Sequence, residues 1–204
     1  MSKRRRLVSV FINCPIDAEY QEFFDAIVFT IMRCGFAPRC AIEIIDTAGT
    51  RIDTIFQLIQ QCPLAVHDIS RTELDSGTNL PRFNMPFELG LFIGACRYGS
   101  TAQHRKKCLV LDKERYRYQK FLSDISGQDI SSHDGNVQTL IRRVRDFLRT
   151  QSGDHIPGAS TIHDSFLAFQ RQKPAITDAL ELEPTELAFA DYLHIVSSYL
   201  NPSV

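Results

Sequence analysis

The side chain with the clearest chemical potential in this sequence is Glu88, within the segment 84–90 (NMPFELG). Its neighbours Phe87 and Leu89 require burial, which predicts that Glu88 lies at the rim of a pocket, one turn into a helix. A lone carboxylate there suits a reaction that passes through a cationic, oxocarbenium-like sugar, because it can stabilise that charge or capture it covalently. Glu88 can equally be a first-turn acid favoured by the helix dipole. Local spacing leaves both interpretations open.

Further polar residues follow the predicted strands or begin the Glu88 helix, and they could hold a nucleotide. The candidate ligand-binding residues are Asn13, Asp17, Asp68, Ser70, Arg71 and Asn84. Carboxylates and hydroxyls suit a ribose, and a guanidinium suits a diphosphate. Each type also has a structural alternative: Asn and Asp form turns, Asn caps helices, and Arg in a polar loop is often only solvated. Glu43 and Asp46 form another polar cluster, after the second predicted strand.

Several common enzyme motifs are absent from the sequence. No G-x-x-x-x-G-K-[ST] or G-x-G-x-x-G phosphate loop follows the first predicted strand, and no G-x-S-x-G or H-E-x-x-H segment occurs. The six cysteines are spread singly, without the Cys/His spacing of a zinc site. We therefore expect a carboxylate-centred site without a metal or a resident cofactor.

The elements that must position these residues alternate between strands and helices. Short apolar runs predict strands at 7–12, 36–45, 63–67 and 108–112, and helical periodicity predicts helices at 23–32, at 52–62 and from 84 onward. Short links between them predict a parallel sheet of four or five strands with helices on both faces. Ligands of such sheets bind beyond the carboxyl ends of the strands, where the strand order reverses. The candidate residues fall at that edge.

Beyond residue 112 the pattern weakens. Helices are expected at 116–122 and 137–148, a linker at 151–158, and two further helices after it. We therefore divide the chain into an α/β domain, 1–150, and a linker with a helical C-terminal extension, 151–204. The last helix, about 186–200, carries an apolar stripe that must be buried.

The charge of the chain is balanced but unevenly distributed. Its 204 residues contain 23 Lys and Arg and 24 Asp and Glu, which argues against a chain built to bind nucleic acid. Residues 97–120 carry eight basic side chains against two acids, and residues 174–204 carry five acids and no Lys or Arg. We expect the acidic C-terminal helix to pack on the basic region of its own subunit or of a neighbour.

The beginning of the sequence indicates where the protein works. The basic residues 3–6 precede an apolar run of only six residues, too short for a signal peptide or a membrane span. Isolated cysteines are typical of a reducing compartment. We expect a cytoplasmic, soluble protein without a membrane partner.

Three segments resemble known proteins. The strings 10–15 (VFINCP), 34–40 (CGFAPRC) and 67–75 (HDISRTELD) are similar to an uncharacterised bacterial group described as TIR-like, after the Toll/interleukin-1 receptor domains. The order of an FIN strand end, an acid after the third strand and NMPFELG also resembles two characterised groups. In TIR domains, a Glu early in the third helix cleaves the nicotinamide–ribose bond of NAD. In nucleoside 2-deoxyribosyltransferases, a Glu in an E-L-G context is the nucleophile at the sugar C1′.

The resemblance covers roughly residues 7–148 and implies both a fold and an activity. It implies a TIR- or flavodoxin-like sheet and an NAD⁺ hydrolase (N-glycosidase) in which Glu88 is catalytic and NAD is the substrate. It also implies an antiphage defence role, as a homo-oligomer or with a partner protein of the defence system. Two alternatives stay open: a non-catalytic module that binds a nucleotide signal or a protein, and a nucleoside 2-deoxyribosyltransferase or nucleotide hydrolase.

Overall fold

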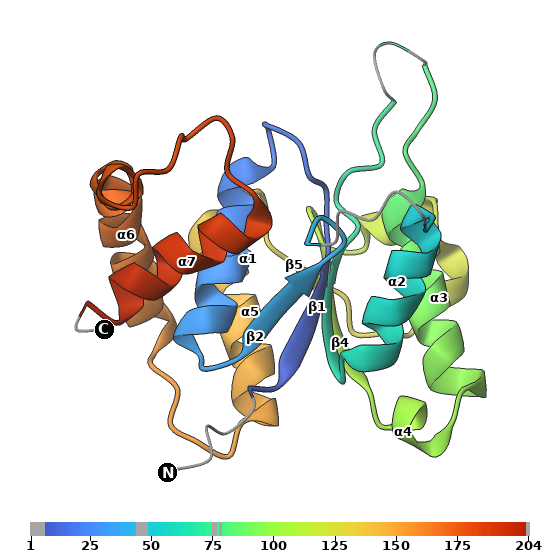
Figure 1. The fold of residues 1–204 in the computed structure, drawn as a ribbon. Helices are drawn as coiled ribbons and strands as arrows, with labels where there is room; N and C mark the ends of the chain where they lie inside the picture. The colour runs from blue at the N-terminus through green and yellow to red at the C-terminus, as the bar shows by residue number, and fades with distance from the viewer. Residues whose placement is uncertain (1–6, 44–48, 75–76, 78, 203–204) are drawn as a thin grey trace.

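A five-stranded parallel sheet forms the centre of the molecule (Figure 1). The computed structural model describes residues 7–43, 49–74, 77 and 79–202. The strand order is β2-β1-β3-β4-β5, and every neighbouring pair is parallel. This confirms the predicted α/β fold with flavodoxin-like order. The strands are β1 (Ser9–Asn13), β2 (Ala37–Cys40), β3 (Leu64–Asp68), β4 (Lys107–Asp112) and β5 (Ser131–Ser132).

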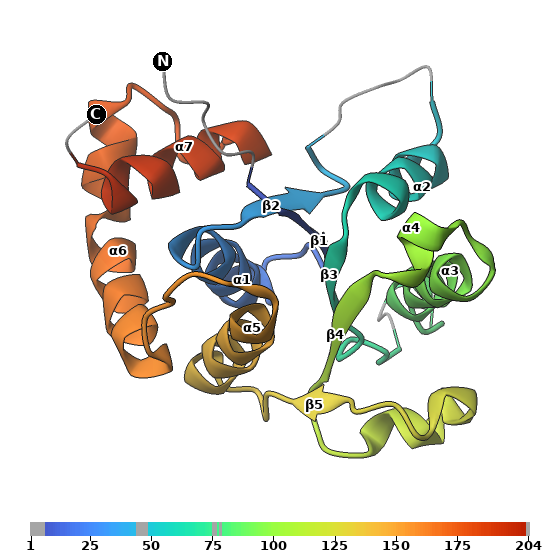
Figure 2. The same cartoon turned by 90° about the horizontal axis from the view of Figure 1, so that it is seen from below.

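Helices cover both faces of the sheet. Figure 2 shows α1 and α5 on one face, with α6 and α7 outside α1, and α2 and α3 with the short α4 on the other. The helices are α1 (Gln21–Arg33), α2 (Arg51–Gln61), α3 (Asn84–Tyr98), α4 (Thr101–His104), α5 (Val137–Gln151), α6 (Ala159–Ala179) and α7 (Phe189–Leu200). None of the helices in the described ranges is long and apolar enough to cross a membrane.

Strand β1 shows why these apolar runs become central strands. Val10 and Ile12 pack into the large apolar cluster beneath α1, whereas Phe11, between them, packs into the cluster beneath α2 and α3. Successive side chains of a strand point to opposite faces, so a strand covered on both sides must be apolar throughout.

The C-terminal helices complete the core on the α1 side. The Phe29 ring of α1 stacks on Phe169 of α6 with 5.2 Å between centroids. The buried Asp25 carboxylate of α1 accepts a hydrogen bond from Lys173 Nζ at 2.8 Å, and the Asp25 carbonyl accepts one from the Tyr192 hydroxyl of α7 at 3.4 Å. Helices α6 and α7 thus belong to the same apolar cluster as α1 and β1.

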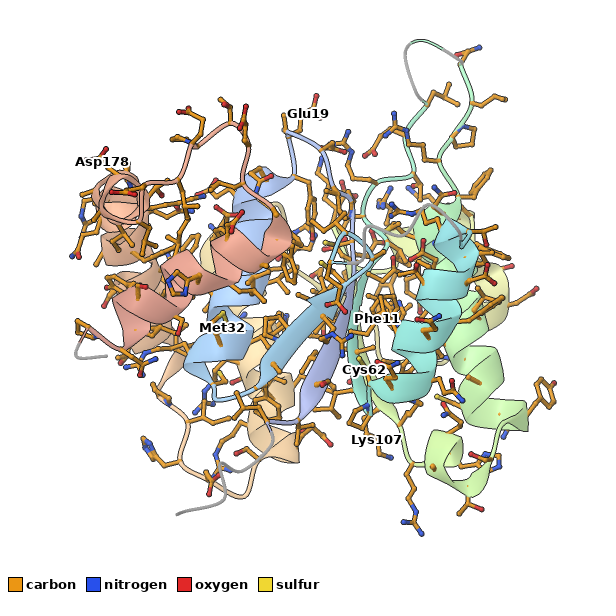
Figure 3. All side chains as sticks on the ribbon, in the orientation of Figure 1. Phe11, Glu19, Met32, Cys62, Lys107 and Asp178 are labelled. Atoms are coloured by element: carbon orange, nitrogen blue, oxygen red, sulfur yellow. The ribbon has the colours of Figure 1, made fainter. Side chains whose placement is uncertain are left out.

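This packing corrects the expectation that the acidic helix rests on the basic region of its own subunit. The apolar stripe of α7 faces α1 and α6, on the opposite side of the sheet from α3 and α4 (Figure 2). Strand β4 lies within the basic stretch 97–120, so some of the basic residues precede the strand and others follow it at the opposite end of the sheet. Figure 3 places Lys107 at the edge opposite Glu19, with Asp178 far from both. Apolar burial therefore determined the place of α7.

Three local predictions need correction. Helix α3 includes Asn84, and its N-cap is Phe83, so the Asn84 side chain caps nothing. The helix expected at 116–122 is a short 3-10 turn, Arg117–Lys120, because Tyr116 adopts a left-handed φ of 63°. Strand β2 ends at Cys40, where a turn begins whose Glu43 amide donates to the Cys40 carbonyl. Asp46, of the polar cluster predicted after the second strand, lies outside the described residues.

Candidate functional site

The candidate site lies at the carboxyl edge of the sheet, between β1 and β3. The chain places β2 on one side of β1 and β3 on the other, so the strand order reverses there. Asn13 at the end of β1 is directly in register with His67 near the end of β3. Open α/β sheets bind ligands at such a reversal, and the sequence prediction placed the site at this edge.

Glu88 is the chemically unusual residue of this edge. Its residue surface is only 6% exposed, and among the described residues no hydrogen bond or ion pair reaches its carboxyl group. Burial raises the pKa of Glu88 from 4.5 to about 7, although the positive charge of Arg51 acts in the opposite direction. An unpaired buried carboxyl is costly to ionise, and a cation brought beside it would recover that cost.

The neighbours of Glu88 come from three elements. Glu88 lies on the inward side of α3 with Leu89 and Phe92, which are buried. Arg51 is the first residue of α2, whose start is fixed by a capping box between Thr50 and Asp53. Cys14 follows β1, and burial raises the pKa of its thiol, with the charges of Asp68, Cys40 and Glu88 acting in the same direction. The Cys14 thiol is therefore uncharged where it lines the site.

Asn13 connects three elements beneath the site. Its Nδ2 group donates to His67 Nδ1 at 2.9 Å and to the Met85 carbonyl in the first turn of α3 at 3.1 Å. Burial lowers the pKa of His67 to about 3, so its ring is neutral. Asn13 is 2% exposed, and its Oδ1 atom is buried without a hydrogen-bond partner among the described residues. Asn84, by contrast, is exposed at the start of α3.

Asp68, predicted as a ligand-binding or a turn-forming residue, is a structural centre of this edge. Its side chain is fully buried, and it accepts hydrogen bonds from the Ser70 amide at 2.8 Å and the Tyr20 hydroxyl at 2.7 Å. His133 Nε2 lies 3.3 Å from its Oδ2 atom. Burial alone would raise the pKa of Asp68, but these three groups hold it below its ordinary value. Asp68 therefore joins three loops of this edge.

The remaining predicted residues lie at the rim. Arg71 is half-buried and pairs with Glu19 at 2.7 Å and with Asp17 at 3.5 Å. Ser70 is buried, and its carbonyl accepts a hydrogen bond from the Arg117 guanidinium at 2.7 Å. The structure thus brings Asn13, Asp68 and Ser70 together as the buried frame of the site, with Asp17 and Arg71 as a neutralised pair on its surface.

Sequence reasoning missed three residues of this edge. Tyr20 and His133 hold Asp68, and Arg117 anchors the segment after β3 while pairing with the buried Asp112 at 2.6 Å. The signal available for Arg117 was its place in the basic stretch, five residues after the acid that ends β4. Nothing local marked Tyr20 or His133.

The site can supply one carboxyl group, whose charge depends on what lies beside it, and a nearby guanidinium. Among the described residues, no group of three His, Cys, Asp or Glu side chains could hold a metal ion. A hollow of about 470 Å³ lies between α2 and the α3–α4 region, lined by residues such as Phe56, Leu91 and Gln103, and does not include Glu88.

No protein-family model matches the chain, and no curated protein matches it at a significant level. What this edge of the sheet can do follows from its own residues.

Proposed function

We propose that the protein is an N-glycosidase that cleaves the nicotinamide–ribose bond of NAD, with Glu88 stabilising or trapping the ribosyl cation. The observation that carries this proposal is the buried, unpaired Glu88 carboxyl at the point where the strand order reverses. Ion-paired acids of the same edge, such as Asp112, already have a cation. Glu88 has none in contact, so it is the acid best prepared to receive a cationic substrate.

The raised pKa of Glu88 fits this chemistry. With its pKa raised toward neutral pH, Glu88 is readily protonated in the free protein, and the positive nicotinamide ring of a bound NAD would favour the ionised form. When the C–N bond breaks, its electron pair leaves with nicotinamide, which departs neutral. The positive charge passes to the ribose, beside the carboxylate. Water then adds to the sugar and releases a proton. The leaving group needs no general acid.

The wider role follows from the same proposal. NAD is the substrate, no other cofactor is required, and consumption of NAD would suit an antiphage defence effector. Such an effector would act as a homo-oligomer or with a partner protein of the defence system. Arg71 contributes little to nucleotide binding unless the substrate displaces Glu19 or Asp17 from it.

The engaged state of Asp68 and Arg71 favours a second candidate, a non-catalytic module that senses a nucleotide or a protein with the same edge. Both residues already have partners within the protein, so few free polar groups are left to orient a substrate. A third candidate, a nucleoside 2-deoxyribosyltransferase or nucleotide hydrolase, would use Glu88 as a nucleophile at C1′.

The test measures nicotinamide released from NAD by the full chain, by Glu88→Gln and by the control Glu186→Gln, whose exposed acid lies before α7. We expect at least a roughly 100-fold loss in Glu88→Gln and none in the control. Release that persists in Glu88→Gln would overturn the residue assignment. Absence of release under all conditions, with candidate partners included, would overturn the activity. Base exchange between deoxynucleosides would favour the transferase, and saturable nucleotide binding without turnover the module.

A further inference from the structure

Helix α3 lacks the polar outer face that a surface helix normally has. Among its residues, Asn84–Tyr98, the only charged side chains are Glu88, which faces inward, and Arg97. The helix nevertheless lies at the outside of the molecule, beside α2 (Figure 2). A helix that is apolar on all sides is normally buried on all sides. One face of α3 is thus left without a partner among the residues that the structure describes.

The uncovered face has a distinctive order of side chains. Gly90 and Gly94 lie one turn apart, and a Cβ atom built on either would meet nothing within 4 Å. Phe87 and Tyr98 flank the two glycines and are 57% and 89% exposed. We call Phe87, Gly90, Gly94, Arg97 and Tyr98 the α3 strip. It is smooth in the middle and has an exposed aromatic residue at each end.

The exposed aromatic residues supply most of the area that a small dimer interface needs. Phe83, just before α3, is 55% exposed, and the three aromatic residues together offer about 400 Å² per copy if each has roughly 200 Å² to bury. Two copies would bury about 800 Å² from these side chains, against the roughly 1,000 Å² of a small specific interface. The partly exposed Leu91 beside the α3 strip and the backbone at the two glycines can supply the rest.

We propose that the α3 strip binds the same strip of a second copy of this chain, antiparallel and across a two-fold axis. An antiparallel crossing midway between the glycines sets Gly90 of one copy opposite Gly94 of the other, so that the backbones approach closely. The same register sets Arg97 opposite Phe87 of the second copy, where its guanidinium lies over an aromatic ring. Each such contact occurs twice, as a two-fold interface requires.

The charges of the α3 strip do not oppose the binding of a second copy. The two Arg97 side chains lie at opposite ends of the crossing, so they do not repel each other closely, and no acid is buried. The proposal does not depend on the proposed enzymatic activity, because it concerns the outer side of α3 and Glu88 lies on the inner side.

The experiment compares the full chain with Gly94→Glu and with the control Gly153→Glu by sedimentation velocity over a wide concentration range. Both glycines have open space around a built Cβ, so neither variant disturbs packing within the chain, and Glu is a better helix former than Gly. Gly153 lies in the α5–α6 loop, away from α3. We expect a dimer of twice 23.2 kDa for the full chain and for the control. Gly94→Glu should weaken dimerisation at least about 100-fold, because it buries like charges near the axis.

A full chain that stays monomeric at every concentration would overturn the proposal, as would a dimer that Gly94→Glu leaves unchanged. A parallel measurement uses vesicles of anionic phospholipid. If the monomer sediments with the vesicles and Phe87→Ser abolishes this, the α3 strip binds a lipid surface and the dimer is refuted. Thermal unfolding monitored by circular dichroism confirms that each variant is folded.

Discussion

Replacing Glu88 by Gln should stabilise the protein at alkaline pH and leave its stability almost unchanged in acid. Below its ordinary pKa of 4.5, Glu88 is protonated in both the folded and the unfolded chain. Between 4.5 and about 7 the unfolded chain loses this proton while the folded chain keeps it, so stability falls as pH rises. Above about pH 7 the folded chain holds an ionised carboxylate that burial disfavours, and the loss is complete. Gln cannot ionise and avoids that loss.

The size of the effect follows from the shift. Raising the pKa from 4.5 to about 7 corresponds to about 3 kcal/mol of lost stability at high pH. Screening by solvent brings the expected gain of Glu88→Gln nearer to about 2 kcal/mol. Urea unfolding at about pH 4 and about pH 8.5 measures it, with no gain expected at the lower value.

The control for this measurement is Glu186→Gln, which removes an exposed acid and should show no such pH dependence. A Glu88→Gln protein that is less stable than the parent at high pH would refute the reasoning. A gain of equal size at both pH values would refute it as well, because it would have a cause other than ionisation.

Three further substitutions test contacts in different parts of the fold by urea unfolding. Tyr20→Phe removes a hydrogen bond to the buried Asp68 and should cost about 1–3 kcal/mol; no loss would mean that water replaces the hydroxyl. Lys173→Met leaves Asp25 without its cation at the α1–α6 contact and should cost about 2–4 kcal/mol. Gly99→Ala should cost about 1–3 kcal/mol, since the new Cβ would lie 2.4 Å from a backbone oxygen of α3; unchanged stability would show that the turn gives way.

Much of the fold could be predicted because its signals are local. Residues 7–12 are apolar without interruption, as a strand covered on both faces requires, and 23–32 repeat with the period of a helix. Short links between such segments leave a parallel sheet as the main solution. The position of the candidate site followed from that topology, before any contact was known.

The structural role of Asp68 could not be predicted in the same way. Its hydrogen-bonding partner Tyr20 is 48 residues away in the sequence. His133 follows β5, which lies two strands away from β3 in the sheet. A short acid-containing loop is typical of a turn and of a ligand site alike, and only tertiary contacts separate the two. The prediction that α7 packs on the basic region of its own subunit was wrong for a related reason. Buried apolar area stabilises such a contact more than surface charge does.

The union of α6 and α7 with α1 has a consequence for synthesis on the ribosome. Asp25 meets Tyr192 across 167 residues of sequence. Protein synthesis proceeds at roughly 5–20 residues per second, so the outer side of α1 stays exposed for about 10–30 s before α7 has been made. During that time the phenylalanines of α1 have no permanent partner, and the nascent chain is vulnerable to aggregation. Chains truncated after α5 would retain this exposure permanently, so the C-terminal helices act as an obligatory final step of folding.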